Sequence, residues 1–141
     1  MLRRVALIAA SGLINLCLGD FHVLTASIGT GSGGSDQQLA CPSNYWNCNC
    51  MFHNDRTGYV DSGNADASTG STFFQISAGL CGLGEMNFYR NGDAWDYYLA
   101  GGDGSKIGSC YSNSASKTCY IPVLGLGSGE DLLVCYGYPC N

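Results

Sequence analysis

Residues 85–99 read EMNFYRNGDAWDYYL, and this stretch predicts a β-hairpin. Two β-prone runs, Glu85–Arg90 and Asp93–Leu99, flank the dipeptide Asn91-Gly92. Asparagine and glycine both tolerate the positive φ that a type I′ turn requires, so the dipeptide favours a two-residue connection. The aromatic face of this hairpin is expected to be its core side. The predicted cross-strand pairs on that face are Met86 with Tyr97, Phe88 with Trp95, and Arg90 with Asp93.

The rest of the chain repeats this pattern of short β-prone runs separated by turn residues. Glycine accounts for 21 of 141 residues, about twice its usual share of roughly 7%. After residue 20 no apolar period of 3.6 residues is sustained, which argues against long helices. Further strands are expected at 21–28, 72–77 and 131–136, and a second hairpin should pair 106–111 with 118–123. The sequence therefore predicts an all-β fold, an antiparallel β-sandwich or barrel of about six to seven strands.

The first 19 residues have the composition of an export signal. Arg3 and Arg4 precede a mostly apolar run, Val5–Leu18, and small residues follow at a plausible cleavage site. The run is too short and too interrupted to cross a hydrocarbon core of about 30 Å. We expect a signal peptide over 1–19 and one domain over 20–141, secreted and without a membrane anchor. An uncleaved anchor and a buried first strand are the alternatives.

Eight of the nine cysteines lie after this segment. An even number of cysteines in an oxidising compartment indicates a disulfide framework, so four bridges are expected. The sequence does not choose among the pairings. The eight residues are Cys41, Cys48, Cys50, Cys81, Cys110, Cys119, Cys135 and Cys140.

The charge of the expected mature chain limits its partners. Residues 20–141 hold four of the six basic residues and all 11 acidic ones, a net charge of −7. Phosphate backbones and anionic lipid surfaces repel such a chain at long range. We therefore expect no nucleic-acid partner. We also expect the protein to be a monomer.

Two motifs suggest a cofactor or a metal, and neither has the context that it needs. Gly29-x-Gly31-x-x-Gly34 matches a dinucleotide fingerprint, but the following residues contain Cys41 and Pro42 and cannot supply the required helix. Cys48-x-Cys50-x-x-His53 resembles a zinc motif, but an oxidising compartment consumes thiolates. The aspartate groups lack the spacing of a calcium loop. We expect no cofactor and no metal.

The candidates for acid–base catalysis are few. His22 and His53 are the two histidines, and histidine is the side chain that titrates near neutral pH. With Glu85 and Arg90 they resemble the His, Glu and Arg set of small fungal ribonucleases, which are also acidic and disulfide-bonded. However, the hairpin places Glu85 and Arg90 on opposite faces, because they are five residues apart.

Aromatic residues are the main candidates for binding. Exposed tyrosine and tryptophan anchor protein interfaces and stack on sugars. The alternative for each residue is partial burial against the disulfides. The candidate binding residues are Tyr45, Trp46, Tyr89, Tyr98 and Tyr138.

Several segments together carry a family resemblance. These are Asp20-Phe21-His22-Val23, Glu85–Tyr89, Gly108-Ser109-Cys110, and the C-terminal cysteines Cys135 and Cys140. With the signal, they make the chain resemble the small secreted cysteine-rich proteins of filamentous ascomycete fungi, many of which are candidate effectors in virulence. The resemblance implies action outside the producing cell, by binding, masking or toxicity. We expect a binding protein for a host extracellular protein or a cell-wall polysaccharide. The alternatives are a small secreted ribonuclease-like hydrolase and a killer-toxin-like antimicrobial protein.

Overall fold

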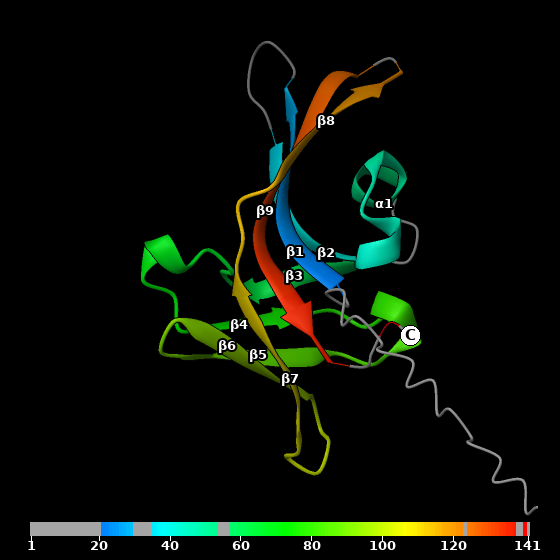
Figure 1. Cartoon of the computed structure of the whole chain (residues 1–141). Coiled ribbons are helices and arrows are strands. Elements are labelled where there is room, and N and C mark those ends of the chain that lie inside the picture. The colour runs from blue at the N-terminus through cyan, green and yellow to red at the C-terminus, as the bar shows by residue number, and fades with distance from the viewer. Residues whose placement is uncertain (1–20, 30–34, 54–56, 123, 138–139, 141) are drawn as a thin grey trace, which may run out of the picture.

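The computed structural model describes residues 21–29, 35–53, 57–122, 124–137 and 140. Within them nine strands form one antiparallel sheet (Figure 1). One short α-helix, α1 (Cys48–His53), and three 3₁₀ turns, at Ser43–Tyr45, Ala67–Thr69 and Leu80–Gly82, connect them. The strands are β1 (Phe21–Gly29), β2 (Ser35–Pro42), β3 (Gly58–Gly63), β4 (Phe73–Ile76), β5 (Met86–Asn91), β6 (Ala94–Leu99), β7 (Lys106–Ser112), β8 (Ser116–Ile121) and β9 (Gly125–Tyr136).

The sheet closes on itself. The strand order is β1-β2-β3-β4-β5-β6-β7-β9, and β9 also pairs with β1. This closure makes an eight-stranded antiparallel barrel, with β8 as an additional strand beside β9. The predicted all-β barrel is therefore confirmed, with slightly more strands than the expected six to seven.

The predicted second hairpin is wrong. β7 and β8 do not pair with each other, because both pair with β9. β9 is twelve residues long, and β7 and β8 pair with successive parts of it. Residues 113–115 separate β7 from β8. There the Asn113 amide donates to the Leu132 carbonyl, and the Asp131 amide donates to the Ala115 carbonyl. The turn-rich segment 113–115 therefore separates two strands on the same side of β9. The hairpin is formed by β8 and β9.

The hairpin of β5 and β6 exists, but its register differs from the prediction. Asn91 pairs with Ala94, so the two-residue loop is Gly92-Asp93. Gly92 has a φ of 62°. The φ of Asp93 is not positive, because among the described non-glycine residues a positive φ occurs at Cys81. A positive φ at the first loop position alone is the pattern of a type II′ turn, not of type I′.

The shift of two residues leaves the core side unchanged. Side chains alternate across a strand with a period of two, so an even shift keeps each residue on its face. The predicted core residues Met86, Phe88, Trp95 and Tyr97 are all buried. Phe88 stacks on Tyr97 with ring centroids 5.1 Å apart, and these rings fill the barrel interior.

A second hydrophobic cluster lies outside the barrel, under α1. The pairing of β1 with β9 shifts register between Val23 and Leu24, where Leu132 is an extra residue on β9. Val23 packs in the barrel interior, whereas Leu24 packs in the second cluster with Met51 of α1. Gly127 of β9 permits the close approach of the helix segment, because a Cβ there would lie 2.6 Å from the Phe52 ring.

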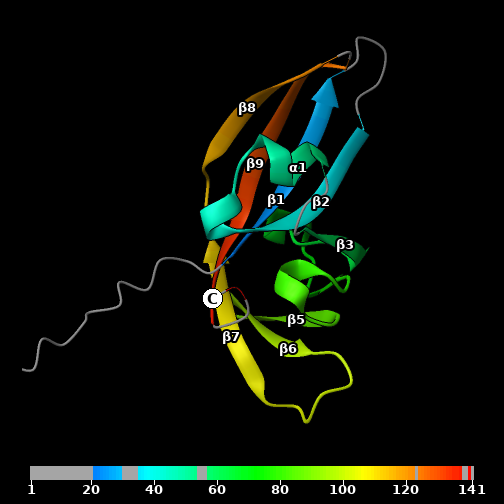
Figure 2. The same ribbon diagram turned by 90° about the vertical axis from the view of Figure 1, so that its right-hand side faces the viewer.

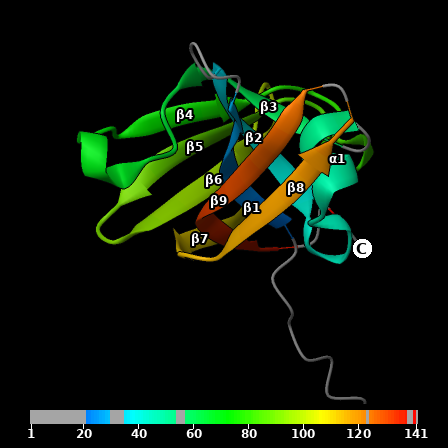
Figure 3. The same ribbon diagram turned by 90° about the horizontal axis from the view of Figure 1, so that it is seen from above.

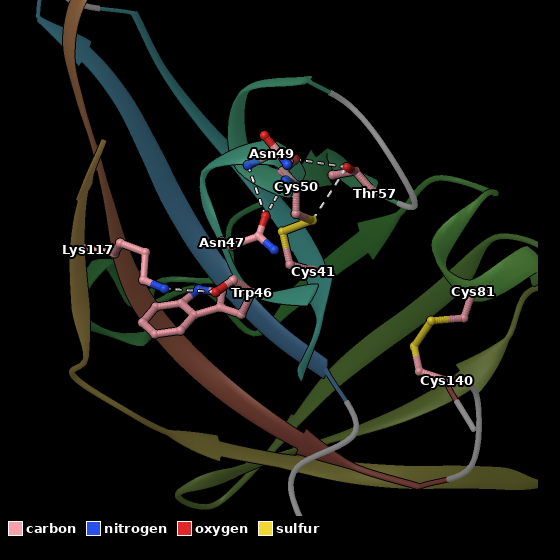
Figure 4. Close-up of a disulfide and its surroundings, with 9 residues drawn as sticks. All are labelled: Cys41, Trp46, Asn47, Asn49, Cys50, Thr57, Cys81, Lys117 and Cys140. Carbon is pink, nitrogen blue, oxygen red and sulfur yellow. Dashed lines mark hydrogen bonds between the residues drawn. A yellow bond between two sulfur atoms is a disulfide. The ribbon is translucent and has the colours of Figure 1, made fainter. Parts of the chain in front are cut away.

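The arrangement of these layers is visible in three views. β1, β2, β8 and β9 extend together to one end of the molecule, and α1 lies beside them (Figures 1 and 2). Seen from above, β4, β5 and β6 lie on one side of β8 and β9, and α1 lies on the other (Figure 3). Asn47 begins α1, since its side-chain Oδ1 accepts hydrogen bonds from the Asn49 and Cys50 amides (Figure 4).

All eight predicted cysteines form disulfides, which confirms the expected number of four. Two bridges hold the segment around α1, and one joins directly opposite residues of β7 and β9. No helix within the described ranges is long and apolar enough to cross a membrane. The pairs are Cys41–Cys50, Cys48–Cys119, Cys81–Cys140 and Cys110–Cys135.

Candidate functional site

The outer side of β4, β5, β6, β7 and β9 carries a group of aromatic side chains. Because the barrel interior takes every second residue of these strands, the alternate residues point outward. Polar side chains lie between the rings. We define the outer aromatic face by its five rings: Phe73, Tyr89, Tyr98, Tyr111 and Tyr136.

The face contains an unbroken line of directly paired residues that crosses five strands. Phe73 of β4 pairs with Tyr89 of β5, which pairs with Asp96 of β6. Asp96 pairs with Ser109 of β7, and Ser109 pairs with Tyr136 of β9. Neighbouring strands lie about 4.8 Å apart, so four steps span about 19 Å. These four steps are half of the circuit of the eight-stranded barrel, so the line curves around the barrel wall and its two ends point in different directions.

The rings pack against one another and remain open to solvent. The Phe73 and Tyr89 centroids are 5.3 Å apart, and those of Tyr89 and Tyr98 are 6.0 Å apart. Tyr111 and Tyr136 form a second pair, also at 6.0 Å. Tyr89 is 47% exposed and Tyr111 is 49% exposed. Each pair thus supports its members without removing them from water.

Asp96 lies between the two groups of rings and is held as a carboxylate. Its Oδ1 accepts from the Ser109 hydroxyl at 2.7 Å and from Lys106 Nζ at 3.4 Å. Its Oδ2 accepts from Asn91 Nδ2 at 2.9 Å. These hydrogen bonds hold the pKa of Asp96 below its usual value, and the bond from Ser109 has the largest effect. The centre of the line is therefore an oriented anionic acceptor.

A second polar group lies beside the rings. Gln75 Nε2 donates to Glu85 Oε1 at 2.7 Å and to Asn87 Oδ1 at 2.9 Å. The bond to Glu85, a predicted catalytic candidate, places its carboxylate in a network with the amide side chains of Gln75 and Asn87. The amides and the carboxylate orient one another, so the face presents donors and acceptors in defined positions.

A separate polar cluster lies at the junction of β1, β9 and the segment before α1. His22 Nδ1 lies 2.6 Å from Asp131 Oδ2, and Asn113 Nδ2 donates to the same oxygen at 2.6 Å. The Trp46 ring stacks on the imidazole with centroids 5.2 Å apart. Lys117 Nζ lies 5.1 Å from the Trp46 ring centroid and donates to the Trp46 carbonyl (Figure 4). We call these five residues the His22 cluster.

The His22 cluster connects distant segments around a buried charge. The Asp131 side chain is fully buried, and an unpaired buried carboxylate is strongly unfavourable. His22 and Asn113 both bond Oδ2, whereas the buried Oδ1 has no hydrogen-bond partner among the described residues. Asn113 lies in the break between β7 and β8, so the cluster fixes that break against β9 and β1. Sequence reasoning missed Asp131, because its partner His22 lies 109 residues away.

The structure does not bring the predicted ribonuclease-like residues together. His22 lies in β1, and Arg90 lies in β5. These two strands are opposite each other in the barrel, since four steps separate them in either direction. Arg90 donates to two backbone carbonyls near its own hairpin, and Glu85 joins the Gln75 network. The side chain of His53 lies outside the described part of the molecule.

The predicted binding residues fall into two places. Tyr89 and Tyr98 lie together on the outer aromatic face. Tyr45 and Trp46 pack against the second hydrophobic cluster and are half-buried, as the alternative for them predicted. Tyr138 lies outside the described residues.

Three rings of the face were missed by sequence reasoning. Phe73, Tyr111 and Tyr136 each alternate with a buried neighbour in a strand. This alternation was the available signal. It could not be used without the strand order, which brings β4, β7 and β9 around β5 and β6.

The motifs considered for cofactors and metals have other roles or cannot be placed. Cys48 and Cys50 are both in disulfides, so they are not thiolate ligands. Across the described ranges, no three His, Cys, Asp or Glu side chains are grouped to hold a metal ion. Residues 30–34 of the glycine motif lie outside those ranges.

Comparison of the chain with protein-family models, with curated proteins and with solved structures finds no match. The function must therefore be argued from the chemistry of the outer aromatic face and the His22 cluster.

Proposed function

We propose that the protein is an extracellular binding module that holds cell-wall polysaccharide on the outer aromatic face. The observation that carries this proposal is the contiguous ring group Phe73, Tyr89 and Tyr98, with Asp96 paired directly to Tyr89. A pyranose ring has apolar C–H faces and a rim of hydroxyl groups. Aromatic faces attract the C–H groups, and carboxylate, amide and hydroxyl side chains bond the rim.

The charge of the face supports a neutral ligand over a nucleic acid. The chain has a net charge of −5, and Asp96 is held as an anion at the centre of the face. A phosphate backbone would meet repulsion there, since nucleic-acid binding depends on Lys and Arg contacts. The hydroxyl groups of a neutral polysaccharide meet none.

The composition of the face also supports a sugar over a protein partner. The buried centre of a protein interface is apolar and depleted of charged residues. Here the centre of the line is a carboxylate bonded to a serine and a lysine, and the rings lie on either side of it. Hydroxyl groups of a sugar add hydrogen bonds to such a centre, whereas an apolar protein surface would remove water from a charged group without adding any.

The extracellular location is part of the proposal. Four disulfides are typical of small proteins of oxidising compartments. The export signal expected over residues 1–19, and the resemblance to secreted cysteine-rich fungal proteins, agree with this location. On this basis the protein acts at a cell wall outside the cell that produces it.

Retention on insoluble polymers tests the proposal. Purified oxidised protein is incubated with chitin, with cellulose and with insoluble β-glucan, and the unbound fraction is measured. We expect at least one polymer to retain the wild type, and the double variant Tyr89→Ala/Tyr98→Ala to bind it about tenfold or more weakly, because two stacking contacts are lost.

A matched control tests whether loss of any exposed tyrosine weakens binding, or only loss of a tyrosine on the outer aromatic face. Tyr120 of β8 is 77% exposed and lies outside the outer aromatic face. Tyr120→Ala should bind like the wild type. Failure of every polymer to retain the wild-type protein would contradict the proposal.

A further inference from the structure

We infer that the bridge Cys81–Cys140 is the site at which the folded protein exchanges disulfides with a dissolved thiol, so that a reducing environment releases Cys140 from the rest of the fold. This inference is independent of the proposed function, because it concerns neither the outer aromatic face nor its ligand. Three features distinguish this bridge from the other three: its exposure, its place outside the helix and the strands, and the backbone of Cys81.

Exposure separates Cys81–Cys140 from the other bridges. Cys81 and Cys140 are both half-buried, whereas each of the other bridges contains at least one buried cysteine. A thiolate must reach a sulfur atom before exchange can occur, so access limits the rate. The bridge with exposure at both ends is therefore the one that a thiol reaches most readily in the folded state. The buried cysteines of the other bridges are Cys41, Cys50, Cys110, Cys119 and Cys135.

Neither cysteine of this bridge lies in the sheet or in α1. Cys81 is in the 3₁₀ turn Leu80–Gly82, and Cys140 lies beyond Tyr136, the last residue of β9. The cysteines of the other bridges all lie in strands or in α1. Figure 4 shows Cys81–Cys140 well separated from Cys41–Cys50 and its helix. Opening near the end of a chain disrupts less structure than opening within a ladder of strands.

The backbone of Cys81 has an unfavourable conformation. Its φ is 52°, and it is the non-glycine residue of the described chain with a positive φ. A Cβ is disfavoured in this left-handed region, and such strain persists only where the surrounding structure imposes it. The Gly82 amide donates to the Gly79 carbonyl and so holds the turn, and the disulfide adds a second constraint. Exposed and strained bridges are reduced more easily than others.

Loss of this bridge should leave the barrel closed. Cys81 and Cys140 pack against the barrel core as half-buried residues, whereas the core itself consists of buried side chains such as Phe88 and Tyr97. The pairing of β9 with both β1 and β7 closes the sheet, and three bridges remain. Reduction therefore frees Cys140 from the turn Leu80–Gly82 without opening the sheet.

The exchange is balanced by two molecules of a small thiol such as glutathione. The thiolate of the first molecule attacks one sulfur of the bridge and forms a mixed disulfide, and the other cysteine leaves as a thiolate that takes up a proton. The second molecule attacks the glutathione sulfur of the mixed disulfide and releases the remaining cysteine as a thiol. Two electrons thus pass to the bridge, and the two small thiols become one disulfide.

Reduction of the native protein by glutathione tests the inference. The oxidised protein is incubated with increasing concentrations of reduced glutathione at constant pH, free thiols are alkylated, and mass spectrometry quantifies alkylated and glutathione-bound cysteines. We expect Cys81 and Cys140 to react at least about tenfold faster than any other cysteine of the bridges. Cys48–Cys119 is the internal control, because only one of its cysteines is buried. Near-ultraviolet circular dichroism of the product with three bridges should match that of the oxidised protein.

The double variant Cys81→Ser/Cys140→Ser provides a second control. It should lack the fast reaction, and its remaining cysteines should react at the slow rate of the wild type. A fast reaction that persists in the folded variant would overturn the inference. Whether or not the variant folds, earlier reduction of another bridge in the wild type, or reaction of all the bridges together, would overturn it as well. Polysaccharide binding plays no part in either measurement.

Discussion

At the scale of single residues, the molecule uses buried and half-buried carboxylates in two ways. Asp131 is fully buried and holds distant segments together through His22 and Asn113. Asp96 is nearer the surface and is oriented by Ser109 and Asn91 as part of the outer aromatic face. The first carboxylate connects segments of the fold, whereas the second is the acceptor that we propose a ligand uses.

Asp131→Ala is expected to destabilise the protein by about 3 kcal/mol, because it leaves His22 and Asn113 without their buried acceptor. Guanidinium unfolding under non-reducing conditions measures this change. Asp61→Ala removes an exposed carboxylate of β3 and should change stability by less than about 0.5 kcal/mol. Equal effects of the two variants would show that the His22 cluster adds nothing to stability.

The pKa of Asp96 should rise when its strongest hydrogen bond is removed. The Ser109 hydroxyl is the largest cause that lowers the pKa of Asp96 from its ordinary 3.8, so Ser109→Ala should move it upward. NMR titration of the carboxyl carbon measures the change. Since the folded-state pKa is depressed, the hydrogen bonds of Asp96 stabilise the fold fully above the ordinary value, and this contribution is lost as the pH falls through the folded pKa. An unchanged pKa in Ser109→Ala would refute the assignment.

At the scale of elements, close approaches of strands decide the path of the barrel. Gly108 of β7 is one such position, because a Cβ there would overlap the Tyr136 carbonyl oxygen and the Tyr97 hydroxyl. The Tyr97 hydroxyl itself donates to the Tyr136 carbonyl. The absence of a side chain at Gly108 therefore lets β9, with the outward-facing Tyr136, lie against β7.

Gly108→Ala should destabilise the protein by about 2 kcal/mol, since the methyl group meets backbone that cannot move independently. Gly84→Ala is the matched control, because its Cβ would meet only the Leu99 side chain at an ordinary 3.5 Å. Thermal unfolding of both variants provides the comparison. A melting temperature for Gly108→Ala equal to that of Gly84→Ala would contradict this account of the β7–β9 contact.

Local patterns predicted the elements better than their pairing. The runs at 21–28 and 72–77 were identifiable from their alternation, the hairpin over 85–99 from its turn dipeptide, and 131–136 from its continuous apolar run. The order β7-β9-β8 was not, because it depends on a long strand that arrives last in the sequence and accepts both β7 and β8. The turn at Gly92-Asp93 was misplaced by one position, since Asn91 suits a strand end as well as a turn.

The candidate site was predictable only in part for the same reason. Tyr89 and Tyr98 lie in one hairpin, so their common location followed from local sequence. Tyr111 and Tyr136 form a second pair farther around the barrel wall, placed there by the pairing of β6 with β7 and of β7 with β9. Such long-range pairings are set by the closure of the whole barrel, and no short segment encodes them.

At the scale of the whole molecule, disulfides connect the barrel with the strands that extend beyond it. Cys48–Cys119 joins α1 to β8 across a sequence separation of 71, whereas Cys41–Cys50 closes a separation of only 9. In the chain-entropy description the longer closure restricts the unfolded chain more. The two bridges should therefore differ in their contribution to stability.

Replacing both cysteines of a bridge with serine tests this difference. The loss should be about 4 kcal/mol for Cys48→Ser/Cys119→Ser and about 3 kcal/mol for Cys41→Ser/Cys50→Ser. Denaturant unfolding of the remaining three-bridge proteins measures both values. A larger loss for the short loop would contradict the entropic ranking.

The central claim is that the outer aromatic face contacts the polysaccharide, and hydroxyl-radical footprinting of the adsorbed protein tests it most directly. Oxidation of each tyrosine is quantified by mass spectrometry in the free protein and in protein bound to the polymer that retains it. We predict protection of Tyr89 and Tyr98 on binding and unchanged oxidation of Tyr120. Unchanged oxidation of Tyr89 and Tyr98, with protection of Tyr120, would contradict the account.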